Sequence, residues 1–415
     1  MLEMEGTSLN QKVLTPKSAF LLCWFAYTLA YFGRVNISVA IPVMEKTLGW
    51  SNTQLGLIGS SFFWIYAIGQ LINGSIGDHV SPRKFVFIGL FFSALLNLAF
   101  GSLTLLPIMI VIWGINGYFQ SMLWGPIVRT LSDHIHPRRN NIVAVGMAAS
   151  MTVGYLMAWG LSGKIVSLLG WRWAFWTPSV ILALYAFLWL IKVKSDKFHN
   201  AVHPTKSKQS LLKITWNDGL WLIMIASIAQ GVVKEGINLW GPMLLMKTHG
   251  LDLSSTVAYS ILIPAIGFSG AILAGLLNKK LNHREKPTIL IMLIASGITV
   301  MAFHIFGAGS AISGTLFLSL TVALLNGANS ILMTIIPLNY VKYKRVSSVA
   351  GLLDFSAYVG AGLSGIFTGI IADKFGISTV AFLWIAFLIL GSLALLGNMF
   401  FKRIAAHAKD QPQMH

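Results

Sequence analysis

Charged residues are scarce in this chain of 415 residues, of which Asp, Glu, Lys and Arg make up only 10%. A soluble protein usually carries about a quarter. Hydrophobic residues make up 55%, and the mean hydropathy is +0.72. This balance excludes a disordered chain, a fibrous repeat and an ordinary soluble enzyme. Cysteine is nearly absent as well, because Cys23 stands alone, and this excludes a disulfide scaffold. The composition predicts an all-α membrane protein that crosses the bilayer many times.

Twelve apolar stretches are long enough to cross a bilayer, which takes roughly 20 mostly apolar residues. They lie near residues 18–42, 53–76, 85–104, 108–131, 141–165, 173–192, 219–243, 256–278, 288–307, 312–337, 348–371 and 378–400. Several contain Gly or Pro, which membrane helices tolerate where neighbouring helices satisfy the released backbone groups. We therefore expect twelve transmembrane helices.

The distribution of Lys and Arg predicts the orientation in the membrane. If the N-terminus is cytoplasmic, 22 of the 30 Lys and Arg fall on the cytoplasmic side and five on the outside. The sequence therefore predicts cytoplasmic N- and C-termini, and the short tails and loops indicate a cell (inner) membrane of bacterial type. The net charge of +17 is spread in small groups over the cytoplasmic segments, so it indicates topology rather than nucleic-acid binding.

One polar stretch divides the chain into two halves of six spans. We expect a cytoplasmic tail over 1–17, an N-terminal half over 18–192, a cytoplasmic linker over 193–218, a C-terminal half over 219–400 and a second tail over 401–415. Residues 160–163 and 362–365 repeat the sequence Gly-Leu-Ser-Gly at an offset of 202. Two parallel halves with a site between them are typical of a transporter.

Two cations lie at matching depths in the first and seventh spans. An ionisable residue in a span is costly, at least ~2.5–3.5 kcal/mol, so each is a candidate functional residue. We expect Arg34 and Lys234 to meet across one central cavity and to hold an anion such as phosphate or a carboxylate. The alternative for Arg34 is a structural pair with a carboxylate.

Helical spacing places further polar residues beside these cations. The first-span face carries Tyr27, Tyr31 and Ser38 with Arg34, and the seventh-span face carries Gln230 and Asn238 with Lys234. We count all of them as candidate substrate-binding residues, together with Trp124 in the fourth span.

Three further charged residues in or near the spans have open roles. Glu235 points about 100° away from Lys234 around the helix, so we expect it to serve another neighbour, or else a substrate or proton. Asp354 is a candidate coupling residue, or a partner of Lys344 or Arg345. Arg129 is either an interfacial anchor or a cation at the cavity entrance.

No catalytic or metal-binding pattern is evident. His134 and His136 lack further ligands nearby, and no glycine loop ending in Lys-Ser or Lys-Thr is present to bind ATP. The sequence therefore predicts neither an enzyme nor a cofactor, and transport would be driven by a gradient or by exchange.

Several motifs resemble those of the major facilitator superfamily, and within it the organophosphate:phosphate antiporters. They are residues 31–36 (YFGRVN), 74–84 (GSIGDHVSPRK), 122–130 (MLWGPIVRT) and 170–176 (GWRWAFW), together with Ala350-Gly351 and Tyr358-Val359-Gly360. The second motif matches the family's loop between spans two and three, in which Asp78 and Arg83 would form a gating charge network.

The resemblance implies alternating-access exchange of a small organic phosphate for inorganic phosphate by a monomer in a lipid membrane. It also implies that Arg34 and Lys234 hold the phosphate and that Tyr27, Tyr31 and Trp124 line the cavity. Two positions depart from the pattern, because Gln70 and Met151 stand where glycerol-phosphate antiporters have Lys and His.

Two alternatives to phosphate exchange remain open. One is a proton-coupled symporter of an organic anion, either a sugar acid or a carboxylate, in which Glu235 or Asp354 carries the proton. The other is a membrane sensor of sugar phosphate that signals through a partner kinase. A drug exporter is disfavoured, because its cavity would be more apolar.

Overall fold

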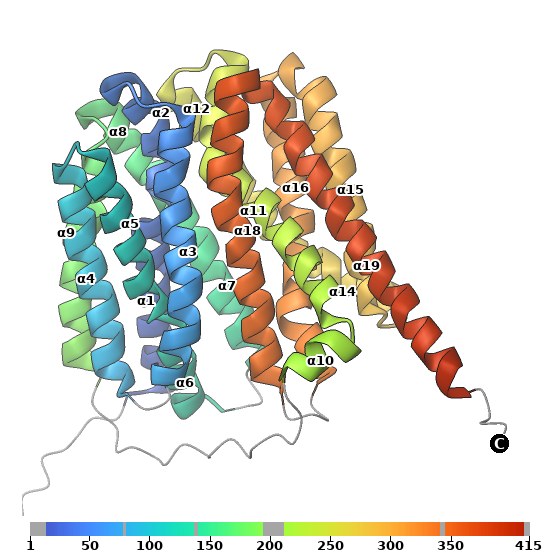
Figure 1. Cartoon of the computed structure of the whole chain (residues 1–415). Coiled ribbons are helices and arrows are strands. Elements are labelled where there is room, and N and C mark those ends of the chain that lie inside the picture. The colour runs from blue at the N-terminus through green and yellow to red at the C-terminus, as the bar shows by residue number, and fades with distance from the viewer. Residues whose placement is uncertain (1–13, 78–79, 137–139, 194–210, 341–344, 411–415) are drawn as a thin grey trace, which may run out of the picture.

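A computed structural model describes residues 14–77, 80–136, 140–193, 211–340 and 345–410, which form helices and contain no strand (Figure 1). The helices are α1 (Pro16–Val35), α2 (Ile37–Leu48), α3 (Asn52–Gly77), α4 (Pro82–Ser102), α5 (Leu106–Ser121), α6 (Trp124–His134), α7 (Asn140–Leu156), α8 (Gly163–Leu169), α9 (Trp173–Lys192), α10 (Leu211–Asn217), α11 (Leu220–His249), α12 (Leu253–Ser260), α13 (Leu262–Gly267), α14 (Gly270–Lys280), α15 (Glu285–Phe306), α16 (Ala311–Ser330), α17 (Ile336–Leu338), α18 (Val346–Phe375) and α19 (Val380–Asp410).

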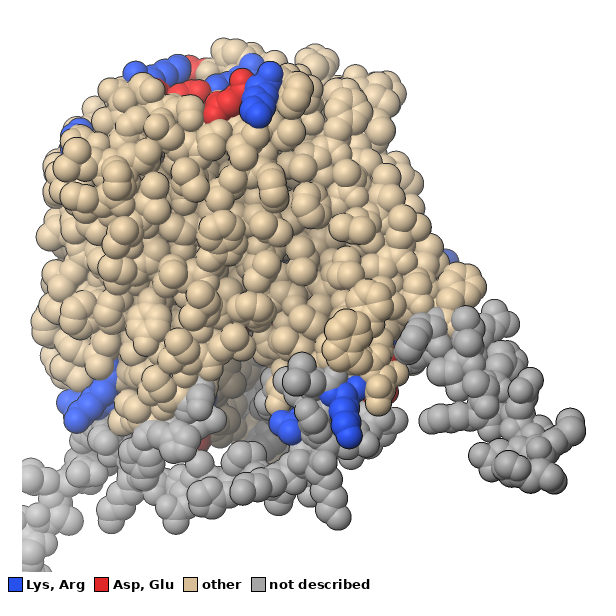
Figure 2. All heavy atoms as spheres, in the orientation of Figure 1, with Lys and Arg blue, Asp and Glu red and all other residues tan. Residues whose placement is uncertain are grey.

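Together these helices make twelve segments that are long and apolar enough to cross a membrane, which confirms the predicted fold class and number of spans. Figure 2 shows why the segments suit a bilayer: on the face in view, the coloured charged side chains lie at the two ends, and the tan surface between them carries almost none. Large apolar side chains such as Leu184, Ile191 and Ile298 are exposed on the described helices and would face lipid.

Some spans are interrupted helices. The first span breaks at Asn36 between α1 and α2, and short π-helical segments interrupt the fifth span (Met157–Ser162) and the tenth (Ile331–Ile335). Helices in a membrane tolerate such breaks only where neighbouring groups satisfy the released backbone atoms. At the break in the first span, buried side-chain amides supply these partners.

Helices from the first and last six spans pack closely against each other at the end where α3 begins and α18 ends. Gly56 of α3 lies against the backbone of Gly365 of α18, and a Cβ at either position would collide with the other's carbonyl. The Ser60 hydroxyl also donates to the Gly362 carbonyl across this contact, at 2.6 Å. Small residues thus let the two backbones approach.

Several expectations fall partly or wholly outside the described residues. They concern Asp78, most of the linker at 193–218, most of the tail at 1–17 and part of the tail at 401–415. The division into two six-span halves and the orientation of the termini stay predictions.

Candidate functional site

A cavity of about 790 Å³ lies between the first and last six spans. Its lining residues reach one end of the bundle only: Gly74 near the end of α3, Gly125 in α6, Val145 in α7 and Ala350 in α18. Among the described residues, Arg83 and Lys84 at the start of α4 lie at this end, which the sequence assigns to the cytoplasm. The cavity therefore opens toward the predicted cytoplasmic side.

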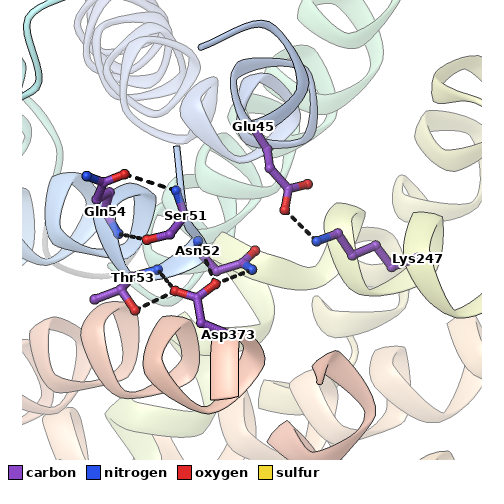
Figure 3. A network of polar contacts seen from close by, with 7 residues as sticks. All are labelled: Glu45, Ser51, Asn52, Thr53, Gln54, Lys247 and Asp373. Carbon is purple, nitrogen blue, oxygen red and sulfur yellow. Dashed lines mark hydrogen bonds and ion pairs between the residues drawn. The ribbon is translucent and has the colours of Figure 1, made fainter. Parts of the chain in front are cut away.

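The opposite end is closed by polar contacts between the two sets of spans (Figure 3). The Asp373 carboxylate, near the end of α18, accepts hydrogen bonds from the backbone N–H groups of Asn52 (2.9 Å) and Thr53 (2.8 Å). It also accepts one from each of their side chains, both at 2.6 Å. Asp373 thus caps the first turn of α3 from another helix. Nearby, Lys247 of α11 pairs with Glu45 of α2 at 2.6 Å.

Arg34 lies next to the inner end of the large cavity, away from the opening. It lines an adjoining pocket of about 20 Å³ rather than the large cavity itself, and its side chain is buried. The rings of Tyr31, Tyr66 and Tyr358 contact the guanidinium, with centroids 5.1, 4.6 and 5.3 Å from Cζ. The same rings line the large cavity. Within the described part of the chain, the guanidinium makes no hydrogen bond or ion pair.

A cluster of buried amides holds the backbone next to Arg34. Because the first span breaks at Asn36, the Gly33 carbonyl accepts hydrogen bonds from side chains: Asn97 at 3.0 Å, Gln120 at 3.3 Å and Asn116 at 3.5 Å. The Asn36 side chain itself donates to Asn97 Oδ1 at 3.0 Å. These amides supply hydrogen bonds to the backbone carbonyl that the break leaves without a helical partner, and they hold the backbone from which the Arg34 side chain projects.

Lys234 lies in the wall of the large cavity and is paired. Its Nζ is 3.0 Å from Oε1 of Glu235, and Glu235 also accepts a hydrogen bond from Asn238 at 3.2 Å. Glu235 thus serves another neighbour, Asn238, as the sequence predicts, but it also pairs with Lys234, which helical spacing did not predict. Adjacent side chains do point about 100° apart on a helix, but the long, flexible lysine stem bends sideways to reach the carboxylate.

Gln230 and Ser38 also lie outside the large cavity. Gln230 is completely buried, and its side-chain amide is 3.5 Å from the Leu325 carbonyl of α16. Ser38 lines the small pocket with Arg34 and donates to the Val35 carbonyl at 2.7 Å, so it satisfies backbone released by the break. Of the two predicted polar faces, Tyr27, Tyr31, Lys234 and Asn238 therefore reach the large cavity.

Aromatic side chains form one wall of the cavity. Tyr27 contacts Tyr31 and Trp124, with ring centroids 5.2 and 4.7 Å apart, and Tyr31 contacts Tyr155 at 5.4 Å. We call these four residues the aromatic wall. Tyr155 was missed by sequence reasoning, as were Tyr66 and Tyr358. Spacing could have found Tyr66 and Tyr358, because they lie four residues from Gln70 and Asp354 on the same helix faces.

Asp354 projects from α18 into the cavity wall, one turn from Tyr358 and nearer the opening. It makes no hydrogen bond or ion pair with any described residue. Lys344 lies outside the described residues, and Arg345 precedes the first turn of α18. In the described ranges, no group of three or more His, Cys, Asp or Glu could hold a metal ion.

The remaining candidates lie away from the cavity wall. Arg129 of α6 is 3.5 Å from the Gly77 carbonyl at the end of α3. Arg83 donates from Nε to the Leu190 carbonyl of α9 at 2.8 Å, which fastens the start of α4 to the end of α9. A network of Arg83 with Asp78 stays a prediction, because Asp78 lies outside the described residues.

Comparison with known proteins agrees with this architecture. A probable hexose phosphate transport protein of Chlamydia trachomatis is 24% identical, with coverage of 86% of this chain and 85% of that protein. The glycerol-3-phosphate transporter of Bacillus subtilis is 24% identical, with 86% of each chain covered. A crystal structure of a bacterial homolog of the human lysosomal transporter Spinster, in an inward-facing and unoccupied conformation, matches with a TM-score of 0.77. It is 16% identical and covers 94% of this chain and 98% of its own.

The sequence profile of the Major Facilitator Superfamily matches residues 23–341, which is more than three quarters of the chain. The twelve apolar helices and the cavity between them are in keeping with that match. The chain therefore belongs to the Major Facilitator Superfamily, and within it resembles the organophosphate transporters.

Proposed function

We propose that this protein is a secondary transporter of small phosphorylated organic anions, which it exchanges for inorganic phosphate across a bacterial inner membrane. The observation that carries the proposal is the placement of two cations from different sets of spans: Lys234 in the wall of a cavity open on one side, and Arg34 in the pocket that adjoins it. An unpaired guanidinium offers two parallel donors that match a phosphoryl group. Transport of phosphorylated compounds by the relatives supports the same substrate class.

The proposed mechanism is alternating access. In the state described, the Asp373 cap and the Glu45–Lys247 pair close one end, while the cavity is open at the other. A phosphoryl group that enters from the open end would reach Lys234 in the wall and the small pocket beside Arg34. Because these cations belong to different sets of spans, a shared ligand draws the two sets together and favours closure on the open side. Release of the outer contacts then exposes the site to the other side.

Counterflow in proteoliposomes tests the proposal. Vesicles containing the purified protein are loaded with inorganic phosphate, and labelled phosphate and glycerol-3-phosphate are offered outside, with and without an uncoupler. We expect uptake that requires internal phosphate and is insensitive to the uncoupler. An Arg34→Ala variant should lose uptake, because the guanidinium is the deep anchor. Normal exchange by that variant would exclude Arg34 as the phosphate-binding group.

The position of Asp354 favours one second candidate, a proton-coupled symporter of an organic anion. A carboxylate that faces the cavity without a partner is a suitable proton carrier. The same vesicles separate the two candidates. Symport would proceed without internal phosphate, would increase in acid outside and would collapse with the uncoupler.

A further inference from the structure

The balance of positive and negative side chains around the cavity does not favour a simple anion. The charged residues in the described wall are Lys234, Glu235 and Asp354, which is one cation and two carboxylates. With Arg34 in the adjoining pocket the formal sum is zero. A phosphate dianion that entered this cavity alone would gain two cations but would also meet two carboxylates.

The pairing of these groups shows which charges are available to a ligand. Lys234 and Glu235 neutralise each other at 3.0 Å. Arg34 and Asp354 have no ion-pair or hydrogen-bond partner among the described residues. Among the described residues, the site thus presents one uncompensated cation and one uncompensated anion. Such groups are costly in a low-dielectric interior unless a ligand supplies their partners.

The two uncompensated charges lie at different depths. The Tyr358 ring is 5.3 Å from the Arg34 guanidinium, and Asp354 precedes Tyr358 by one helical turn on α18, about 6 Å along the axis. Because α18 begins at the open end, Asp354 lies on the side of Tyr358 that faces the opening. A ligand would therefore present its anionic group to the deep end and a cationic group to the shallower level.

Two rings of the aromatic wall suit a cation at that level, because Tyr27 precedes Arg34 by seven residues on α1, about 10 Å along the axis toward the open end, and Trp124 contacts Tyr27. Tyr27, Tyr31, Trp124 and Tyr155 line the same cavity, and Tyr27 and Trp124 lie 4.7 Å apart. The faces of Trp and Tyr rings attract ammonium groups. A cationic group therefore finds a carboxylate from the last six spans and ring faces from the first six.

We propose that the preferred substrate is a zwitterion, namely an alkyl phosphate or phosphonate that also carries an amino or ammonium group. Its phosphoryl group lies at Arg34 and Lys234, and its cationic group lies between Asp354 and the aromatic wall. This inference rests on the proposed function, because it assumes that the site binds a phosphoryl group.

Isothermal titration calorimetry on the full-length protein in detergent tests the inference at pH 7. The probes are ethanolamine phosphate, n-propyl phosphate and glycerol-3-phosphate. The first two have the same length, but ethanolamine phosphate ends in an ammonium group where n-propyl phosphate ends in a methyl group. We expect ethanolamine phosphate to bind about 10-fold to 100-fold more tightly than n-propyl phosphate, as one charge-assisted contact with Asp354 implies.

Variants assign that preference to the carboxylate. Asp354→Asn should abolish the preference and leave n-propyl phosphate bound at least as tightly as before, whereas Asp354→Glu should retain it. Asp133→Asn, which removes an exposed carboxylate on α6, is the matched control and should behave as the unmodified protein.

The outcomes separate this inference from the proposed function. If n-propyl phosphate and ethanolamine phosphate bind equally, the inference is overturned while the proposed function stands. If ethanolamine phosphate is preferred but Asp354→Asn keeps the preference, the assignment to Asp354 is overturned. If no phosphorylated probe binds, the proposed function fails, and the inference falls with it. The comparison of probes on the unmodified protein decides the question even where a variant does not fold.

Discussion

Removal of the Asp373 carboxylate should open the closed end of the bundle. Asp373 of α18 receives four hydrogen bonds from the first turn of α3, two of them from the backbone N–H groups of Asn52 and Thr53. These donors are among the first in α3 and have no partner within that helix. When the two helices separate, the same donors bond to water. The carboxylate therefore stabilises the state in which this end is closed relative to the state in which it is open.

The size of this effect follows from the contacts. A side-chain cap is worth about 0.5–2 kcal/mol, and a carboxylate at a helix N-terminus adds about 0.3–1 kcal/mol. Because the Asp373 side chain is exposed, we take a total loss of about 2 kcal/mol in the stability of the closed end for Asp373→Ala. This loss shifts the equilibrium constant roughly 30-fold toward the outward-open state. Asp373→Asn keeps an acceptor but loses the charge, so its shift should be about half of this in free energy.

Pulsed electron paramagnetic resonance can measure the shift as a distance distribution. Spin labels at Lys46→Cys and Ser378→Cys lie on opposite sides of the closed end, and the buried Cys23 is replaced by serine. Asp373→Ala should add a population at longer distance. Lys247→Gln is the control, because a partly exposed ion pair is worth only about 0–1 kcal/mol. An unchanged distribution in Asp373→Ala, or an equal change in the control, would refute the assignment of the gate to Asp373.

Three further predictions test the site and the helix contact. Arg34→Lys keeps the charge but loses the paired donors, so glycerol-3-phosphate should bind about 10-fold more weakly in calorimetry; unchanged affinity would contradict a bidentate role. Glu235→Gln releases Lys234 from its partner, so inorganic phosphate should bind about 10-fold more tightly; weaker binding would show that the pair itself forms the site. Gly56→Ala inserts a Cβ against the Gly365 carbonyl, so the spin-label distances should lengthen as in Asp373→Ala, whereas Gly297→Ala, in open space on α15, should not change them.

The spans could be predicted from the sequence because a bilayer imposes one simple length rule. The ninth span, expected at 288–307, is Glu285–Gly309 in the structure, and the sixth, expected at 173–192, is Trp173–Lys192. Both depend only on the length of an apolar run and on the polar residues that end it. The candidate charges could be located for the same reason, since Arg34 and Lys234 interrupt such runs.

The details of the site depend on tertiary geometry that no periodicity encodes. The break at Asn36 requires amides from two other helices, α4 and α5, and Asn97 and Gln120 have no local spacing in common with it. Asp373 follows an apolar run beside Lys374, where a solvated carboxylate would be expected. Only the approach of α3 gives Asp373 its role as a cap. Glu235 shows a limit of another kind, because helical spacing fixes the direction of the Cβ but not where a long side chain ends.

The two uncompensated charges also bear on why the proposed transport would be an exchange. For the empty protein to change state, the cavity must close over Asp354 with Arg34 already buried beside it, although neither has a partner among the described residues. Several rings around Arg34 stabilise the guanidinium only in part, because a cation–π contact is worth about 0.5–2 kcal/mol, against a desolvation penalty of several kcal/mol for an ion. A phosphoryl ligand removes that penalty at Arg34 in either direction of travel. On this proposal, inorganic phosphate enables the return step, and efflux without a counter-substrate should be slow.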